Sequence, residues 1–325
     1  MSNPDVLRPR VYVNDVAPRD GLQNERTFVA TPDKIALIDA LSRTGLAKIE
    51  ATSFVSPMAI PALADAAEVM RGITRAPGVV YTALIPNLRG AERALECGVD
   101  EFNLVMSASE THNLTNLRMT RAQSQGALSD VMALAAQSRV PVNVSLSCAF
   151  GCPMEGDVAT EQVMRLAAAF LSGGAAGVTL CDTTGMAYPT QVVALCDAYQ
   201  KQFAGADLTL HVHDTRGMAQ ANVMAAAAAG VRRFDAALGG LGGCPYAPGA
   251  SGNACTEDMV HMLDLIGYDT GIDLGALIAC AQTLPGLIGH DVPSQMVKAG
   301  PRLQLHPVPA SFAEIRERAN ARAAA

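Results

Sequence analysis

Residues 177–213 read GVTLCDTTGMAYPTQVVALCDAYQKQFAGADLTLHVH and show the pattern that the whole chain repeats. The run 177–182 is apolar and suits a buried strand, and a second such run closes the stretch at 209–213. Between them, residues 189–203 have helical spacing and start with Pro189, a favoured first helical residue. Strand, helix and strand in this order predict two parallel strands joined by a right-handed crossover.

The same alternation runs through most of the chain. The candidate strands are Val11–Val16, Lys48–Thr52, Val79–Ile85, Glu101–Met106, Val142–Ser147, Gly177–Asp182, Thr209–His213 and Arg233–Ala237. Clear helices lie between them at Pro32–Arg43, with Thr31 as the expected N-cap, and at Glu161–Ser172. Eight such units match an α/β fold of the (β/α)₈ TIM-barrel type better than an open doubly wound sheet. We expect a single domain, with the barrel over about 10–290 and a tail over about 291–325.

Composition places the chain among globular proteins and excludes several functions. Of its 325 residues, 50% are hydrophobic and 17% are charged, which is enough for a large core. The net charge of −7 opposes binding to nucleic-acid phosphates. The first residues lack a signal-peptide pattern, and the Ala-rich uncharged stretch 166–181 is broken by Gly173 and Gly174, too soon for a membrane span. We therefore expect a cytoplasmic protein with reduced cysteines and neither nucleic-acid nor membrane partners.

Polar side chains recur where the candidate strands end. They are Arg19, Asp20, Glu50, Asn87, Asp182, His211 and His213. Any one of them alone fits a solvated loop residue. Because barrel active sites are built at the C-terminal ends of the strands, their recurrence favours an active site.

The pair His211 and His213 is the strongest metal-binding signal. The period of two in a strand puts both imidazoles on one face, although two strand histidines alone fit a structural pair equally well. Asp20 offers a carboxylate and Asn253 an amide oxygen. This donor set suits Mg²⁺ or Mn²⁺, with zinc as the less favoured cation.

The last candidate strand is followed by GGLGGCPYAPGASGN, residues 239–253, which is too rich in Gly and Pro for a helix or strand. A loop of this length is typical of an active-site lid. Its Cys244 is either an inert thiol or a proton donor and acceptor. Arg19 likewise fits a surface ion pair or a cation that stabilises an oxyanion on a substrate carbonyl.

Several motifs together resemble a known family, the 3-hydroxy-3-methylglutaryl-CoA (HMG-CoA) lyases, over about residues 10–280. The motifs are VAPRDGLQNE (16–25), EATSFVSP (50–57), DTTG (182–185), HVHDT (211–215) and GGLGGCPYAPGASGNACTED (239–258). The resemblance implies a divalent-metal enzyme on a TIM barrel, commonly a homodimer. Its implied reaction is the retro-Claisen cleavage of HMG-CoA, an acyl-CoA, to acetyl-CoA and acetoacetate.

Carried over residue by residue, the resemblance implies three sets of site residues. The metal ligands are Asp20, His211, His213 and Asn253. The catalytic residues are Arg19, Glu50, Asp182, His211 and Cys244. The substrate contacts are Arg19, Gln23, Asn24, Arg26, Asn143 and Ser145. In this scheme Arg19 stabilises the enolate oxygen of acetyl-CoA and Cys244 protonates its carbon.

The chain departs from the family pattern at several positions, among them the segment 105–120 and three single residues. Arg26 stands where members usually carry lysine, and Asn143 and Ser145 stand where they usually carry arginine and tyrosine. We expect Asn143 and Ser145 to point into the barrel mouth, near the distal acid end of the substrate. The loss of a cation and a phenol there motivates the alternative of a lyase for a related 3-hydroxyacyl-CoA, such as citramalyl-CoA.

Two other classes of function remain open. An acetyl-CoA-dependent condensing transferase resembling isopropylmalate synthase shares the barrel, the metal and the histidine pair, but it lacks the glycine-rich loop and adds a C-terminal region. A barrel that binds metal without turnover is the other class, and Arg19 and Cys244 argue against it.

Overall fold

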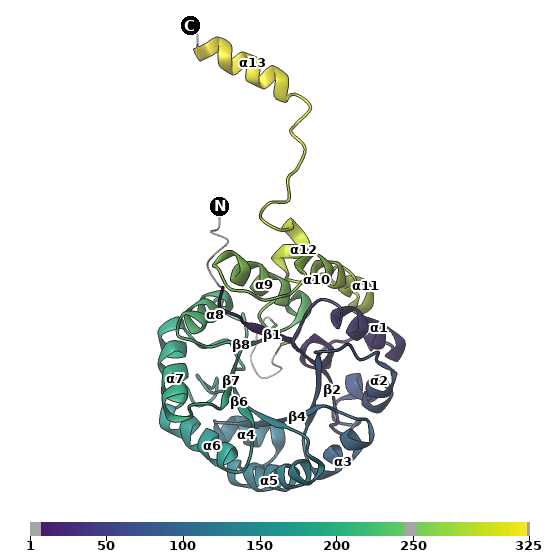
Figure 1. Cartoon of the computed structure of the whole chain (residues 1–325), viewed down its shortest axis with the longest axis vertical. Helices are drawn as coiled ribbons and strands as arrows, with labels where there is room; N and C mark the ends of the chain where they lie inside the picture. The colour runs from purple at the N-terminus through teal and green to yellow at the C-terminus, as the bar shows by residue number, and fades with distance from the viewer. Residues whose placement is uncertain (1–7, 244–251, 324–325) are drawn as a thin grey trace.

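The computed structural model describes residues 8–243 and 252–323, and these form a closed barrel of eight parallel strands inside a ring of helices (Figure 1). The strands are β1 (Tyr12–Asp15), β2 (Lys48–Ser53), β3 (Val80–Ile85), β4 (Glu101–Ser107), β5 (Val142–Ser147), β6 (Gly177–Asp182), β7 (Asp207–Val212) and β8 (Arg233–Ala236). The TIM barrel expected from the sequence is confirmed. Neighbouring strands pair in sequence order, and β8 pairs with β1 to close the sheet.

Helices alternate with the strands and cover the outside of the barrel. The α-helices are α1 (Thr31–Leu41), α2 (Ala66–Gly72), α3 (Leu88–Glu96), α4 (Glu110–Leu117), α5 (Arg121–Ser138), α6 (Thr160–Ser172), α7 (Pro189–Gln202), α8 (Ala219–Ala228), α9 (Thr256–Leu265), α10 (Leu274–Ala281), α11 (Leu284–Ile288), α12 (Gln295–Ala299) and α13 (Phe312–Ala323). Short turns of other helical types are η1 (Ala17–Gly21), η2 (Pro61–Leu63) and η3 (Leu238–Gly240). None of the helices in the described ranges has the length and apolar character needed to cross a membrane.

The start of α1 corrects one sequence expectation. The N-cap of α1 is Ala30, so Thr31 is the first helical residue instead of the cap. The Thr31 hydroxyl donates to Asp65 at 2.8 Å, and the buried Lys34 ammonium donates to the same carboxylate at 2.6 Å. Thr31 therefore ties α1 to the segment before α2, because a buried carboxylate needs hydrogen-bond donors.

The barrel interior is polar in the half where the strands begin. Five of the side chains there are Asn14, Asn103, Asn143, Thr179 and Asp235, and they line a cavity of about 20 Å³. That volume holds about one water molecule. The lower interior is thus a closed polar layer beneath the barrel mouth, and it has no room for an organic ligand.

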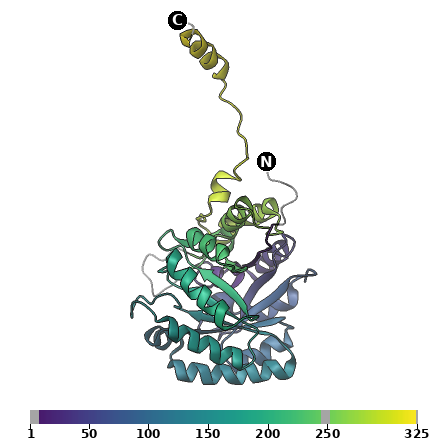
Figure 2. The same cartoon turned by 60° about the vertical axis from the view of Figure 1, so that its left-hand side comes forward.

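The C-terminal tail is separate from the barrel. Helix α13 stands well away from the ring of helices in both views (Figures 1 and 2), and its residues are exposed. By contrast, α12 is held to α9, because the Asp258 carboxylate accepts the backbone N–H groups of Gln295 and Met296 at 3.0 and 2.9 Å. Residues up to α12 therefore pack on the barrel, and the exposed tail follows it.

The buried Asp15 carboxyl at the end of β1 generates a prediction about pH and stability. It accepts hydrogen bonds from the Ala17 N–H and the Thr256 hydroxyl, yet burial raises its pKa to about 7. Because the folded pKa lies above the ordinary value, this group stabilises the fold most at low pH and loses that contribution as pH rises from about 4 to 7. In Asp15→Asn that loss is absent.

We therefore expect the melting temperature of Asp15→Asn, relative to wild type, to rise between pH 5 and pH 8. Thermal denaturation at several pH values measures it. The control is Asp130→Asn on the exposed face of α5, where the difference from wild type should stay flat. A flat difference for Asp15→Asn as well would contradict the prediction.

Candidate functional site

The first part of the site is the turn η1, which directly follows β1. Three successive N–H groups, those of Arg19, Asp20 and Gly21, all donate to the Val16 carbonyl, which makes a single π-helical turn. Such turns recur at functional sites because they redirect side chains. A Cβ on Gly21 would lie 2.9 Å from the Leu241 Cβ, so only glycine lets the turn pack against the start of the glycine-rich stretch.

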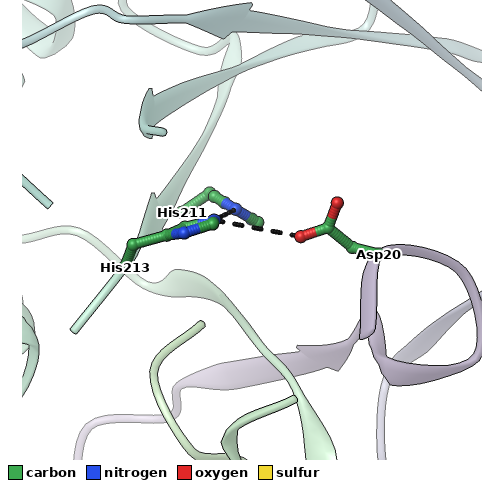
Figure 3. A group of neighbouring side chains, drawn as sticks. All are labelled: Asp20, His211 and His213. Carbon is green, nitrogen blue, oxygen red and sulfur yellow. Dashed lines mark hydrogen bonds and ion pairs between the residues drawn. The ribbon is translucent and has the colours of Figure 1, made fainter. Parts of the chain in front are cut away.

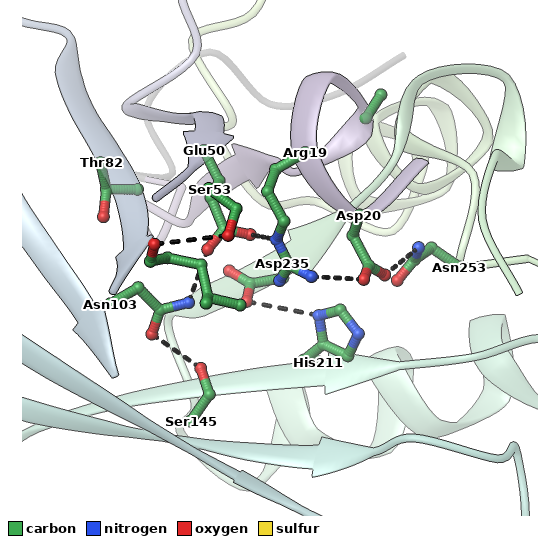
Figure 4. Close-up of polar contacts among 12 residues, drawn as sticks. Arg19, Asp20, Glu50, Ser53, Thr82, Asn103, Ser145, His211, Asp235 and Asn253 are labelled. Atoms are coloured by element: carbon green, nitrogen blue, oxygen red, sulfur yellow. Dashed lines mark hydrogen bonds and ion pairs between the residues drawn. The ribbon is translucent and has the colours of Figure 1, made fainter. Parts of the chain in front are cut away.

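The guanidinium of Arg19 lies between two carboxylates at the barrel mouth (Figure 4). Its Nε donates to Glu50 at 2.6 Å, and its Nη1 donates to Asp20 at 2.5 Å. Burial raises the pKa of Glu50, while the neighbouring Arg19 opposes that shift. These two bonds fix the plane of the guanidinium, and Arg19 as a whole is 9% exposed.

Asn103 on β4 supports Glu50 from below, and sequence reasoning missed it. Its amide nitrogen donates to the second oxygen of Glu50 at 2.7 Å, and its amide oxygen accepts from Ser145 at 2.8 Å and from Asn143 at 3.0 Å. Both atoms of the amide are therefore used. An asparagine facing inward on a strand expected to be apolar was the available signal.

Asp20, His211 and His213 converge on one point above β7 (Figure 3). The two histidine Nε2 atoms are 3.2 Å apart, and the Asp20 Oδ2 lies 3.9 Å from the Nε2 of His213. One donor atom from each of the three residues falls within 4.8 Å of the others. Adjacent ligand atoms of an octahedral cation lie about 3 Å apart and opposite ones about 4 Å, so this group fits a divalent metal ion.

Asn253 joins this group through the glycine-rich stretch after β8. Its amide nitrogen donates to Asp20 at 2.8 Å, and its Oδ1 is buried without a hydrogen-bond partner among the described residues. The two ends of the glycine-rich stretch lie close together. A Cβ on Gly242 would lie 2.5 Å from the Asn253 Nδ2, and a Cβ on Gly252 would lie 2.0 Å from the Gly240 carbonyl oxygen. The unused oxygen completes a donor set of two imidazoles, a carboxylate and an amide oxygen.

The protonation states of these groups suit a cation. Burial acts to raise the pKa of Asp20, but the charges of Arg19, His211 and His213 and the hydrogen bond from Asn253 together hold that pKa below its usual range. Burial, helped by the neighbouring His211, lowers the pKa of His213 to about 4. At neutral pH the carboxylate is thus ionised and the His213 imidazole is neutral, which are the forms that bind metals.

Asp182 closes β6 on the same rim as the histidines. Its Oδ1 accepts the Met186 N–H at 2.7 Å, while its Oδ2 is buried without a hydrogen-bond partner in the described residues. Burial raises the pKa of Asp182 to about 6. This carboxyl can therefore exchange a proton near neutral pH.

Asp235 is a second residue that sequence reasoning missed. It lies on β8, and one of its oxygens is 3.4 Å from the His211 Nδ1. Burial acts to lower the pKa of His211, but the hydrogen bond and charge of Asp235, together with the charge of Asp20, raise that pKa above its usual value. The signal available in the sequence was an acidic residue between the apolar residues Phe234 and Ala236 of the strand segment RFDA.

Several expected substrate contacts lie elsewhere. Asn143, the second residue of β5, bonds to Asn103 and Thr179 in the closed polar layer, so the prediction that it points into the mouth is wrong. Ser145, two residues along β5, is buried and donates to the same Asn103. The physical reason for the position of Asn143 is its depth along the strand: each residue advances about 3.3 Å, and Asn143 lies four residues before the end of β5.

The residues after η1 are closer to solvent. Asn24 is exposed and donates to the Gly243 carbonyl at 2.8 Å, Arg26 is exposed, and Gln23 is half-buried. Asn87, at the end of β3, caps helix α3 by accepting the Gly90 N–H. Cys244 lies outside the described residues.

Comparisons with known proteins agree with this geometry. The chain matches the HMGL-like family over residues 10–284. It is 47% identical to the hydroxymethylglutaryl-CoA lyase YngG of Bacillus subtilis over 88% of this chain and 96% of that protein. It is 41% identical to the (R)-citramalyl-CoA lyase of Chloroflexus aurantiacus, covering 90% of this chain and 95% of that one.

Solved structures give the same result. An HMG-CoA lyase from Acinetobacter baumannii, in complex with coenzyme A and 3-methylmalate, superposes with a TM-score of 0.89 and 52% identity. The match covers 92% of this chain and 98% of that one.

The hydrogen bonds of Asn103 predict a measurable cost of removing them. Asn103→Leu keeps the size of the side chain but leaves the Oε1 atom of Glu50 without a donor and the Ser145 hydroxyl without its acceptor in the barrel interior. We expect the free energy of unfolding to fall by about 2–4 kcal/mol, measured by urea denaturation. The matched control is Asn116→Leu on the exposed side of α4, and equal losses in the two variants would contradict the prediction.

Proposed function

This chain is an enzyme of the HMGL-like family, and from that membership we propose that it cleaves HMG-CoA to acetyl-CoA and acetoacetate with the help of a divalent metal ion. The observation that carries the proposal is the placement of two groups at one barrel mouth. These are the fixed guanidinium of Arg19 and the converging donors Asp20, His211 and His213. Together they suit an acyl-CoA whose cleavage develops negative charge on an oxygen.

We propose that Asp20, His211, His213 and Asn253 hold Mg²⁺ or Mn²⁺. The support is a donor set of nitrogen and oxygen atoms without a thiolate, and an orphaned Oδ1 on Asn253. When bound, such a cation polarises substrate oxygens and makes a coordinated hydroxyl more acidic. The same donors also accept zinc, which stays the less favoured metal.

The protein side chains then supply proton transfer and charge stabilisation. The substrate's tertiary hydroxyl gives its proton to a base at the mouth. Asp182 suits this step, because its pKa is about 6 and its Oδ2 has no hydrogen-bond partner among the described residues. His211 is the other candidate for the base. The C2–C3 bond breaks, and its electron pair moves onto the thioester as an enolate while the hydroxyl carbon becomes the ketone of acetoacetate. Arg19 stabilises the enolate oxygen. Protonation of the enolate carbon, which we assign to the Cys244 thiol, releases acetyl-CoA.

A lyase for citramalyl-CoA is the second candidate. The observation that favours it is the similarity to a citramalyl-CoA lyase at nearly full coverage of both chains. Both substrates are 3-hydroxyacyl-CoA thioesters, so the same groups at the mouth serve either cleavage.

We also propose that the enzyme is a cytoplasmic homodimer. The family resemblance supports the dimer, and the similarity to a bacterial lyase supports the compartment. Light scattering coupled to size-exclusion chromatography tests the oligomeric state.

The proposed function predicts metal-dependent release of acetyl-CoA. We expect HMG-CoA to be cleaved with Mg²⁺ or Mn²⁺ and not with EDTA, and cleavage to be lost in His213→Ala because a donor is removed. The assay compares HMG-CoA with citramalyl-CoA, and a further reaction offers acetyl-CoA and a 2-oxo acid to detect condensation.

The control for this assay is His306→Ala, an exposed histidine in the tail, which should keep full activity. Preferred cleavage of citramalyl-CoA would favour the second candidate. Cleavage of neither thioester by the metal-loaded protein, or undiminished activity in EDTA, would overturn the proposal.

The role of Arg19 predicts a separate kinetic result. Arg19→Met should lower kcat by about 10²–10³-fold, because one donor to the developing oxyanion is lost. Arg19→Lys should restore little, because an ammonium cannot reproduce the two directed bonds to Glu50 and Asp20. Steady-state kinetics with HMG-CoA measure both.

The control is the double variant Arg19→Met with Glu50→Gln, which also removes the buried carboxylate left without its partner. It should regain thermal stability but not kcat. Recovery of kcat in the double variant would show that Arg19 acts only through folding.

A further inference from the structure

Three neighbouring barrel strands bring one polar residue each to the same row beneath the donor group. His211 on β7 is in register with Asp235 on β8, and Asp235 is in register with Asn14 on β1. All three side chains point into the barrel interior, where His211 and Asp235 meet below the mouth (Figure 4). The barrel closure therefore builds a continuous chain from Asn14 to His211.

The contacts along this row are ordered. The Asn14 amide nitrogen donates to one oxygen of Asp235 at 2.8 Å, and the other oxygen of Asp235 faces the His211 Nδ1 at 3.4 Å. The His211 and Asp235 side chains are only 9% and 12% exposed, so water competes little for this contact. An acceptor held against Nδ1 favours the tautomer that carries its hydrogen there.

We propose that Asp235 is a positioning residue that accepts the Nδ1–H of His211 and thereby directs the Nε2 lone pair of His211 toward the space shared with Asp20 and His213, where the metal ion would bind, with Asn14 holding Asp235 in place. This inference rests on the proposed metal site. The role is a general one, because metal-binding histidines commonly donate their second ring hydrogen to a carboxylate that orients the ring.

The second ring nitrogen of His211, Nε2, is placed as this positioning role requires. The His211 Nε2 lies 3.2 Å from the Nε2 of His213, so both nitrogens point at the same space. His213 has no matching support, since its Nδ1 is buried without a hydrogen-bond partner among the described residues. Of the two imidazoles, His211 is thus the one that the described barrel residues orient through Nδ1.

The test is metal binding measured without turnover. We expect Asp235→Ala to weaken Mn²⁺ binding by about ten- to hundredfold in calorimetry, the range found when such supporting carboxylates are removed. Asp235→Asn, which keeps an acceptor oxygen for His211, should weaken it less. In this variant the new amide can still bond to Asn14, whose Oδ1 has no other partner among the described residues.

A second readout follows the tautomer itself. In protein labelled with ¹⁵N-histidine, free of metal and at an alkaline pH where the His211 ring is neutral, the Nδ1–H form of His211 should dominate in wild type and Asp235→Asn, and give way to a mixture of tautomers in Asp235→Ala. A merely structural role would change stability and leave this pattern as it is. If Asp235→Ala fails to fold, Asp235→Asn and Asn14→Ala carry the test, with Asn14→Ala weakening Mn²⁺ binding severalfold.

Controls separate the possible failures. Asp207→Ala removes one negative charge from the exposed start of β7 and should leave Mn²⁺ affinity unchanged. His213→Ala reports on the metal site itself: if it leaves Mn²⁺ binding intact, the proposed site is wrong. If His213→Ala abolishes binding while Asp235→Ala stays within twofold of wild type and keeps the His211 tautomer, the site stands and the inference is overturned.

Discussion

One buried guanidinium between two buried carboxylates is the constraint on which the site depends. Removing ions from water is costly, so each must be met by an opposite charge and by hydrogen bonds. Arg19 donates hydrogen bonds to Glu50 and Asp20. Asn103 donates to the other oxygen of Glu50, and Asn253 donates to Asp20. Two carboxylates against one guanidinium leave an excess negative charge beside two imidazoles. A divalent cation beside Asp20 offsets that excess, which is a physical reason for placing the metal there.

The register of the barrel strands connects these buried charged groups to further polar side chains in the barrel interior. Side chains that face inward on adjacent strands fall into rows, and here the rows below the mouth are polar instead of the usual branched apolar filling. One row links Glu50 through Asn103 to Asn143, and another links His211 through Asp235 to Asn14. The layer beneath the mouth therefore holds the side chains above it through directed bonds, which packing of apolar side chains does not supply.

Much of the fold was predictable because its signals are local. Alternating strand and helix patterns gave every strand to within two residues, and the period of two placed His211 and His213 on one face. The errors concern contacts between distant segments. Thr31 bonds to a partner 34 residues away in place of capping its helix, and Asn143 belongs to the lower polar layer. Asp235 and Asn103 escaped prediction because only the strand ends were considered, whereas orienting residues lie deeper along the strands.

The depth of Asn143 and Ser145 bears directly on the substrate. These two departures from the family pattern motivated the citramalyl-CoA alternative on the premise that both side chains face the distal acid of the substrate. Both side chains donate to Asn103, and Asn143 also donates to Thr179 and lines the cavity, which has room for about one water molecule. Their exchange from arginine and tyrosine is thus a rearrangement of the layer that supports Glu50. The depth of Asn143 removes one of the two departures as a reason to expect a different acyl group, whereas Ser145, the fourth of the six residues of β5, lies nearer the strand end, and its contact with the substrate stays a prediction.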